Sequence, residues 1–290
     1  MLEWYQHLPE HINPVVFTLG FFSLYWYALM YMLALGVSGA FLWRYVKSWL
    51  SFDQYIDLLF NLVLGILIGS RVGYVLLYNF SYYAAKPLAI MWPFDLKTSQ
   101  WIGISGMSYY GGLAGVLVGI WFFVRQHKLS FWRVADAVAF AVPFGYFFGR
   151  IGNFLNGELY GRVTQKIWGM YFLNADAGDM VLRHPSQLYE AFFEGIVLLF
   201  VLIFIRKRYR FSGAVAIAYA VGYSLFRLGV EFFREPDPQI SFLFGWITLG
   251  QIVAAIVSVI GIRLFVFRAK EKSMIQYKQV RKGAQKKILK

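Results

Sequence analysis

The sequence predicts an all-α, polytopic integral membrane protein with about seven transmembrane helices. Of its 290 residues, 59% are hydrophobic, 20% are aromatic and only 15% are charged, whereas soluble domains carry about 25% charged residues. Apolar segments near the roughly 20 residues needed to cross about 30 Å of hydrocarbon recur along the whole chain. The predicted spans are residues 16–43, 55–78, 107–124, 134–148, 187–205, 213–230 and 244–267.

The basic residues lie in alternate loops, which predicts how the chain is oriented in the membrane. Of the 28 Lys and Arg residues, 19 follow the first, third, fifth or seventh span, and none precedes the first. By the positive-inside rule, the amino terminus lies outside and the carboxyl terminus in the cytoplasm. The net charge of +13 is therefore interpreted as a topology signal, with the basic tail of residues 268–290 as an anchor for anionic lipid headgroups. Nucleic-acid binding is the disfavoured alternative.

A single integral membrane domain is expected over residues 1–290, because no internal repeat, linker or second domain is evident. The chain has no cysteine, which excludes a disulfide, a thiolate metal site and a cysteine nucleophile of its own. Its first basic residue is Arg44, so the charged region of a cleavable signal peptide is missing and the first span should be retained. The longest outward loop, about residues 150–185, is expected to form a small extracytoplasmic head.

The fourth span ends in the polar motif "GRIGNFLNGELYGR", residues 149–162. Glycine costs about 1 kcal/mol in a helix interior, so its four glycines favour tightly turned or closely packed backbone. If a helix does continue here, Arg150, Asn153 and Gly157 share one face. The alternative is a polar turn that ends a helix, with an ion pair between arginine and glutamate in water.

A second arginine motif, "YSLFRLGVEFFREPD", closes the sixth span at residues 223–237. The spacing of Tyr223, Arg227, Glu231 and Arg234 predicts that they line one helical face. An arginine in an apolar span is costly and by default indicates a cavity or a bound anion. The alternative is an Arg227–Glu231 pair within the helix that reaches the membrane interface.

A third arginine, Arg71 in "GSRVGYVLLYN", is expected about 10 Å inside the outer end of the second span if that span is helical. Arg71, Arg150 and Arg227 are thus predicted near the outer half of the bilayer on three helices. Their planar guanidinium groups would suit a phosphate, which they can bind through two parallel hydrogen bonds. A phospholipid headgroup is the anion normally found at that depth.

The fifth span opens with "RHPSQLYEAFFEG", residues 183–195. Ser186 is predicted as the N-cap, and Glu190 and Glu194 are expected one turn apart on the same helical face. His184 is as compatible with orienting the cap as with transferring protons.

Two other motifs carry aromatic residues and glycine. The third span opens with "GMSYYGGLAG", residues 106–115, whose Gly-Gly pair permits close contact between helices. Tyr27 and Tyr31 lie one turn apart in "YWYALMY", and this pattern is typical of an aromatic belt at the membrane surface.

Together these motifs resemble those of the bacterial prolipoprotein diacylglyceryl transferase family. The resemblance covers essentially the whole chain, because "WYALMY", "SRVGYVLLYN", "GMSYYGG", "GRIGNFLNGELYGR", "HPSQLYE" and "FRLGVEFFREPD" occur in the family's order. It implies an enzyme of the bacterial cytoplasmic (inner) membrane whose active site faces outward. Such enzymes move the diacylglyceryl group of phosphatidylglycerol to the lipobox cysteine thiol of a prolipoprotein signal peptide, forming a thioether and releasing glycerol 1-phosphate. No metal or soluble cofactor is implied.

The resemblance also assigns candidate site residues. Arg150 and Arg227 match the family's essential arginines and are expected to hold the phosphate, with Glu158, Glu231 and nearby tyrosines orienting them. Fixed cations at that position stabilise the charge that grows on the leaving phosphate. The candidates for substrate binding are Arg71 and the other matched motif positions, which are Tyr27, Asn153, Gly161, Tyr223 and Arg234.

One motif position departs from the family pattern. The residue before the Gly-Gly pair is usually histidine, often proposed as the base that takes the thiol proton, and here it is Tyr110. A thiol has a pKa near 8.5 and reacts as thiolate, whereas tyrosine titrates near 10 and is a poor base at neutral pH. Three routes stay open. An arginine activates Tyr110, another residue such as Glu158, Glu231 or His184 accepts the proton, or the arginine field alone generates enough thiolate.

The alternative function is that of a non-catalytic or altered paralogue. Such a protein would bind phosphatidylglycerol or lipoprotein precursors through the same arginines, having lost the base and kept the phosphate clamp. Transport is a third class, which is disfavoured because the sequence has no inverted repeat and its polar residues cluster toward one side of the membrane.

Overall fold

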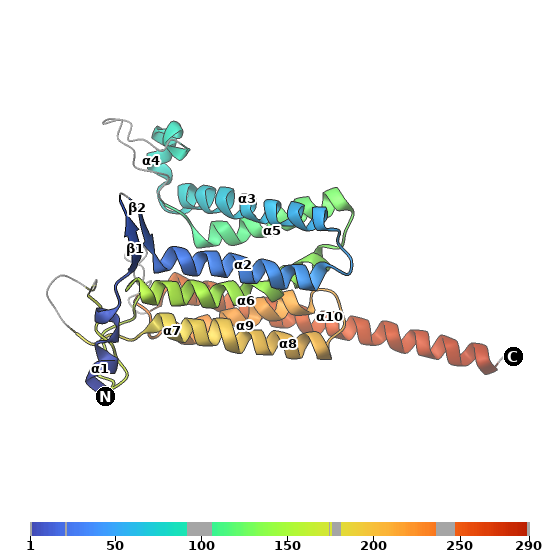
Figure 1. Ribbon diagram of the computed structural model, residues 1–290. Helices are drawn as coiled ribbons and strands as arrows, with labels where there is room; N and C mark the ends of the chain where they lie inside the picture. The colour runs from blue at the N-terminus through green and yellow to red at the C-terminus, as the bar shows by residue number, and fades with distance from the viewer. Residues whose placement is uncertain are drawn as a thin grey trace. The chain divides into compact units, whose positions relative to one another are not determined.

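The computed structural model describes residues 2–20, 22–91, 106–173, 175, 181–235 and 247–288, with side chains for all of these except residues 2, 249 and 273–288. Most of this chain is helical (Figure 1). Its contacts divide it into unit 1, Met1–Leu42 with Asp136–Lys290, and unit 2, Trp43–Ala135. The longer helices are α2 (Trp26–Val46), α3 (Phe52–Leu77), α5 (Tyr109–His127), α6 (Phe131–Leu155), α8 (Leu198–Arg208), α9 (Ala214–Val230) and α10 (Leu249–Ile288).

The first predicted span is only partly helical, which corrects the expectation of a helix over residues 16–43. Its first part forms an antiparallel pair of strands, β1 (Val15–Leu19) and β2 (Phe22–Tyr25), and α2 begins at Trp26. β-Branched and aromatic residues in this stretch favour extended backbone, although their hydropathy equals that of a membrane helix. Two short elements, α1 (Leu2–Gln6) and the 3₁₀ helix η1 (Leu8–His11), precede the strands.

Unit 2 is built on close contact between α3 and α5, which lie side by side in Figure 1. Gly69 and Gly73 of α3 pack against Gly111 of α5 so tightly that a Cβ on any of them would meet backbone atoms. The predicted contact through the Gly-Gly pair is therefore confirmed. Ser51 forms a capping box with Gln54 at the start of α3. The short α4 (Phe80–Ala85) and the 3₁₀ helix η2 (Pro87–Ile90) follow α3.

Unit 1 holds the remaining long helices. The α6 helix packs against α2, where the rings of Phe41 and Phe144 stack with centroids 3.8 Å apart. Asp136 of α6 caps the start of α9 by accepting hydrogen bonds from Gly213 N at 2.7 Å and Ala216 N at 2.9 Å. The predicted fifth span is a continuous run of α7 (Ser186–Glu190), the π-helix η3 (Ala191–Val197) and α8.

The chain between α6 and α7 forms an irregular region that packs against the amino-terminal segment. Phe154, Met170 and Phe172 are buried together with Tyr5 and Leu8 at their edge. Backbone bonds such as Tyr171 N to Gln6 O, 2.8 Å long, connect the two stretches. These contacts give the predicted head a hydrophobic core of its own, which includes residues from the start of the chain.

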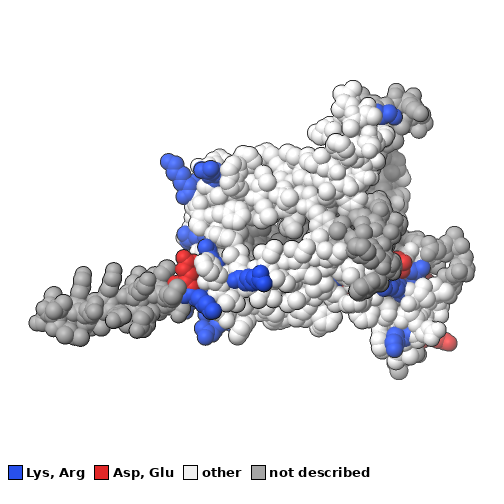
Figure 2. Space-filling view, turned by 180° about the vertical axis from the view of Figure 1, so that it is seen from behind, with Lys and Arg blue, Asp and Glu red and all other residues white. Residues whose placement is uncertain are grey.

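By length and composition, five helices among the described residues could cross a membrane. They are Trp26–Val46, Phe52–Leu77, Phe131–Leu155, Ser186–Arg208 and Gly250–Lys272, and Ala214–Val230 is a shorter apolar helix. On the face shown in Figure 2, charged side chains lie toward the helix ends and the surface along the middle of the helices is uncharged. The protein is therefore a polytopic membrane protein. Two parts of the sequence predictions lie outside the described residues. These are the start of the predicted seventh span, from Phe244, and Asp237 of the second arginine motif.

Candidate functional site

Arg150 and Arg227 converge on one carboxylate, that of Glu190 at the end of α7. Arg150 Nη2 lies 2.7 Å from Glu190 Oε2, and Arg227 Nη1 lies 3.2 Å from the same oxygen. The Glu190 side chain is completely buried, whereas 16% and 15% of the two arginine side chains are exposed. The predicted convergence of these two arginines is therefore observed, with an acidic residue already between them.

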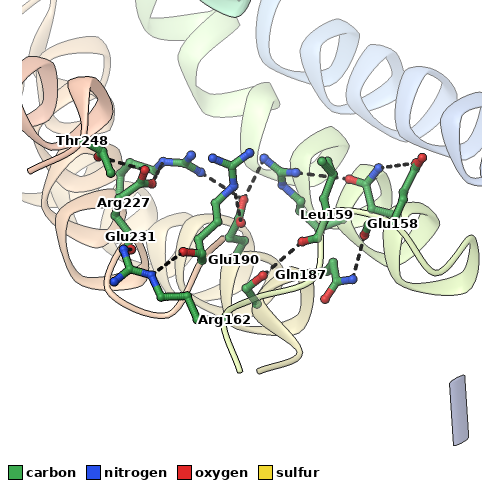
Figure 3. A network of polar contacts seen from close by, with 12 residues as sticks. Glu158, Leu159, Arg162, Gln187, Glu190, Arg227, Glu231 and Thr248 are labelled. Atoms are coloured by element: carbon green, nitrogen blue, oxygen red, sulfur yellow. Dashed lines mark hydrogen bonds and ion pairs between the residues drawn. The ribbon is translucent and has the colours of Figure 1, made fainter. Parts of the chain in front are cut away.

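Further polar groups extend this centre along α9 and the turn after it (Figure 3). Arg227 Nε pairs with Glu231 Oε2 at 3.0 Å, and Thr248 Oγ1 donates to Glu231 Oε1 at 3.0 Å. Arg234 Nε lies 3.8 Å from Glu190 Oε1. The Arg227–Glu231 pair considered for the helix face is thus present, but it is buried and joined to Glu190 rather than exposed at an interface.

The glycine motif contributes a second branch, which begins on the last turns of α6. Arg150 Nη1 donates to Asn153 Oδ1 at 3.2 Å, and Asn153 Nδ2 donates to Glu158 Oε1 at 2.8 Å. The helix runs through Gly149 and Gly152 to Leu155, so the first part of the motif follows the helical alternative. The turn comes at Gly157, whose φ of 66° only glycine adopts at low cost.

Two α7 side chains fix the backbone that follows this turn (Figure 3). Gln187 Nε2 donates to Glu158 O at 2.7 Å, and Ser186 Oγ donates to Leu159 O at 3.1 Å. Ser186 was predicted as the N-cap of this helix, but the cap position is Pro185 and the serine hydroxyl is used across the fold instead. Both side chains are fully buried, so they hold the backbone at Glu158 and Leu159 against α7.

Gly161 forms a backbone bridge to Arg234, which joins the glycine motif to the second arginine motif. Gly161 N donates to His184 O at 2.8 Å, and Arg162 N donates to Phe233 O at 2.9 Å. A Cβ on Gly161 would collide with the Phe233 carbonyl oxygen. Glycine is therefore required here by the close approach of two backbone segments.

His184 packs beside this bridge, outside the membrane-spanning helices. Its Nδ1 lies 3.1 Å from the Tyr189 hydroxyl, and its ring meets Phe233 edge-on. Burial, assisted by the positive charge of Lys166, lowers the pKa of His184 below its usual value. These surroundings favour the neutral imidazole, and Nδ1 shares a hydrogen bond with the Tyr189 hydroxyl.

Tyrosines surround the arginine pair. The Tyr146 hydroxyl donates to Glu190 Oε2 at 2.9 Å and accepts from Arg150 Nη2 at 3.0 Å. Tyr223 packs edge-on against the Tyr146 ring at 5.8 Å and interacts with Arg227. Tyr27 interacts electrostatically with Arg150 and with Glu158. Both sequence-predicted tyrosines of unit 1 therefore lie at the site.

Arg71 and Tyr110 belong to unit 2. The Arg71 guanidinium donates to the carbonyl oxygens of Ile90 at 2.6 Å, Ala89 at 2.9 Å and Gly106 at 3.2 Å, and it lies over the Tyr83 ring. It therefore anchors the chain that follows α3. Tyr110 is half-buried on the first turn of α5, next to the glycines that contact α3.

Three site residues were not among the sequence candidates: Glu190, Tyr146 and Glu194. Glu190 and Glu194 are acidic residues in an apolar span, and such residues are usually functional. That signal was available in the sequence, whereas the role of Tyr146 as a bridge depends on the packing of α6 against α7. The resulting cluster combines three guanidinium groups with buried carboxylates, an arrangement suited to binding a phosphate and transferring a proton.

Comparisons with known proteins agree on one family. The family model for prolipoprotein diacylglyceryl transferase matches residues 14–267. A Chlorobaculum tepidum protein is 43% identical over 269 residues, which cover 91% of this chain and 92% of that protein. An Aliarcobacter butzleri protein is 40% identical over 276 residues, which cover 93% of this chain and 98% of that protein. A Vibrio campbellii protein is 42% identical over 274 residues, which cover 93% of this chain and 95% of that protein. All three are named phosphatidylglycerol–prolipoprotein diacylglyceryl transferase.

Proposed function

We propose that this chain, which belongs to the prolipoprotein diacylglyceryl transferase family, transfers the diacylglyceryl group of phosphatidylglycerol to the lipobox cysteine of prolipoproteins. The observation that carries the proposal is the convergence of Arg150 and Arg227 on a buried anionic position. Two guanidinium groups at one point match the oxygens of a phosphodiester. No metal or soluble cofactor enters the reaction.

The thiol sulfur attacks the glycerol carbon of the diacylglyceryl group, and the carbon–oxygen bond to phosphate breaks. The electron pair moves to the leaving oxygen, so glycerol 1-phosphate carries one more negative charge than the diester phosphate. Arg150 and Arg227 stabilise this charge where it develops. Glu231 and Glu158 orient them, Glu158 through Asn153.

The other matched residues form the walls of the same site. Tyr27, Tyr223 and Arg234 contact the lipid headgroup or the peptide, and Gly161 keeps the two arginine motifs together. For Arg71, the three carbonyl contacts favour a role in holding the chain after α3. Tyr110 is a candidate for the thiol proton because it occupies the position of the family's usual histidine.

The site faces outward from the bacterial cytoplasmic membrane. The positive-inside pattern supports an external amino terminus, a cytoplasmic carboxyl terminus and seven spans, formed by α2, α3, α5, α6, the α7–η3–α8 run, α9 and α10. Residues 1–290 act as one membrane transferase domain, with the region around 150–185 as its external head. Phosphatidylglycerol and the signal peptide then reach the arginines from the outer leaflet.

The direct test incubates the purified protein with phosphatidylglycerol and a lipobox peptide and detects the diacylglyceryl thioether by mass spectrometry. The adduct and glycerol 1-phosphate are expected in equal amounts. Arg227→Ala should lower turnover about 100-fold or more, which is the usual cost of one fixed donor to a developing charge. A folded Arg227→Ala variant that works at the normal rate would remove Arg227 from the mechanism, and binding without any adduct would replace catalysis by a binding function.

A further inference from the structure

Glu194 is a buried acidic residue that has no role in the proposed binding of phosphate. It lies in the π-helix η3, the side chain is only 1% exposed, and neither carboxylate oxygen has a hydrogen-bond partner of good geometry among the described residues. A buried carboxyl group without partners is costly, and π-helical turns in α-helices occur frequently at functional sites. The position therefore calls for a chemical explanation.

The other carboxylates of the site are already engaged. Glu190 holds Arg150 and Arg227, Glu231 pairs with Arg227, and Glu158 accepts from Asn153. Protonating any of these would break a contact that orients the clamp. Glu194 can gain or lose a proton without breaking an ion pair of its own.

The neighbours of Glu194 connect it to the reaction centre. The charged and titratable groups that act on it are Glu190 on α7, Tyr146 and Arg150 on α6, and Arg227 on α9. Tyr146 is half-buried, and its hydroxyl, which donates to Glu190, also interacts with Glu194. The Tyr146 hydroxyl thus interacts with both carboxylates.

We propose that Glu194 accepts the proton that the substrate thiol gives up, and that the proton reaches it through the Tyr146 hydroxyl. The thiol proton moves to the phenol oxygen as the phenol proton moves to Glu194. The thiolate then forms the carbon–sulfur bond, and the broken carbon–oxygen bond leaves its electron pair on glycerol 1-phosphate. Glu194 finally returns the proton to the leaving phosphate or to water, which balances the reaction.

This inference rests on the proposed function and answers the question raised by Tyr110. Glu194 lies near the carboxylate of Glu190 and the guanidinium groups of Arg150 and Arg227. A carboxylate in that position can hold a proton temporarily. Isolated tyrosine is a poor base at neutral pH, but as a relay Tyr146 never has to carry the negative charge for long.

The test compares two lipobox peptides that differ in one atom, one with cysteine and one with selenocysteine. A selenol is ionised at neutral pH, so its reaction needs no base, whereas a thiol with a pKa near 8.5 does need one. Wild-type protein should modify both peptides. Glu194→Gln should modify the thiol peptide about 100-fold or more slowly at pH 7, the usual contribution of a general base, and the selenol peptide at nearly the wild-type rate.

The pH profile supplies a second readout. In Glu194→Gln the thiol rate should rise about tenfold per pH unit up to the thiol pKa, because only thiolate formed in solution can then react. Glu194→Asp should retain part of the base function. Ser258→Ala is the matched control, because Ser258 is another buried polar residue whose hydroxyl has no hydrogen-bond partner in the part of the chain that the structure describes, and it should behave as wild type.

Each other outcome overturns the proposal. Equal losses for thiol and selenol would make Glu194 structural, and normal thiol turnover would make it irrelevant. Selenol rescue in Tyr110→Phe but not in Glu194→Gln would assign the proton to Tyr110. If wild type modifies neither peptide, the transferase function itself fails, which is a different result from a failure of Glu194 alone.

Discussion

Arg150 on α6 and Glu190 at the end of α7 form a buried ion pair with a separation of 2.7 Å. Because Glu190 also holds Arg227 from α9, this carboxylate joins three helices of unit 1 at one point. Its removal would leave two guanidinium groups largely buried without their shared counter-charge. The site and the helix packing around it therefore depend on the same side chain.

Glu190→Gln should accordingly destabilise the protein by about 3–5 kcal/mol, the usual cost of removing one partner of a buried ion pair. The measurement is thermal or denaturant unfolding in detergent. Glu235→Gln is the control, because Glu235 pairs with Arg183 at 3.3 Å but is 51% exposed, and exposed pairs contribute less than about 1 kcal/mol. Equal unfolding midpoints for the two variants would contradict this role of Glu190.

Arg150→Lys tests whether the guanidinium shape matters beyond its charge. Arg150 contacts Glu190 and Tyr146 through Nη2 and Asn153 through Nη1, and one ammonium group cannot reproduce that planar arrangement. We expect kcat to fall about 100-fold and KM to change by a smaller factor. Thermal unfolding should be measured in parallel, and wild-type turnover by a folded Arg150→Lys variant would show that charge alone suffices.

Gly161→Ala should disrupt the contact between the two arginine motifs. The added methyl group would meet the Phe233 carbonyl oxygen and the His184 backbone, and such overpacking costs about 1–3 kcal/mol. Gly149→Ala, in the same motif, is the matched control because its Cβ would meet nothing within 4 Å. It lies inside α6 and should be neutral or stabilising by about 0.5–1 kcal/mol. Similar effects of the two substitutions on unfolding and turnover would count against the bridge.

His184 should make stability depend on pH in the acidic range. Burial lowers its pKa in the folded protein, so the unfolded chain binds more protons between that value and the ordinary value near 6.5. Stability is therefore complete above about pH 6.5 and falls as the pH drops toward the folded-state pKa, by at most about 1.4 kcal/mol per pH unit for one proton. His184→Gln should flatten this part of the profile. An unchanged slope in unfolding measured from pH 7.5 to 5 would exclude His184 as the cause.

The sequence was sufficient to predict most of the long helices and the approach of Arg150 to Arg227. Arg150 and Arg227 each lie at the end of an apolar span, where a charge is costly enough to indicate a function. Their partner was harder to identify, because Glu190 meets both arginines only when α6, α7 and α9 come together. No pattern of neighbouring residues in the sequence predicts that arrangement.

The differences from the sequence predictions have local physical causes. Residues 16–25 are as apolar as a membrane helix, so hydropathy alone could not separate the β1–β2 pair from α2. Gly149 and Gly152 remain helical because packing of α6 outweighs a cost of about 1 kcal/mol per glycine. The π-turn at η3, which places Glu194, leaves no recognisable pattern in the sequence.

Glu190 also has a consequence for which anions the site can accept. A tethered carboxylate competes with every incoming anion at an effective concentration that can reach the millimolar range. A small soluble phosphate brings nothing to offset that competition. A phospholipid has its acyl chains in the bilayer beside the site, and this anchoring keeps its phosphate at a high local concentration too. If the arginines bind phosphate, the internal glutamate would favour anions that arrive from the membrane over those that arrive from solution.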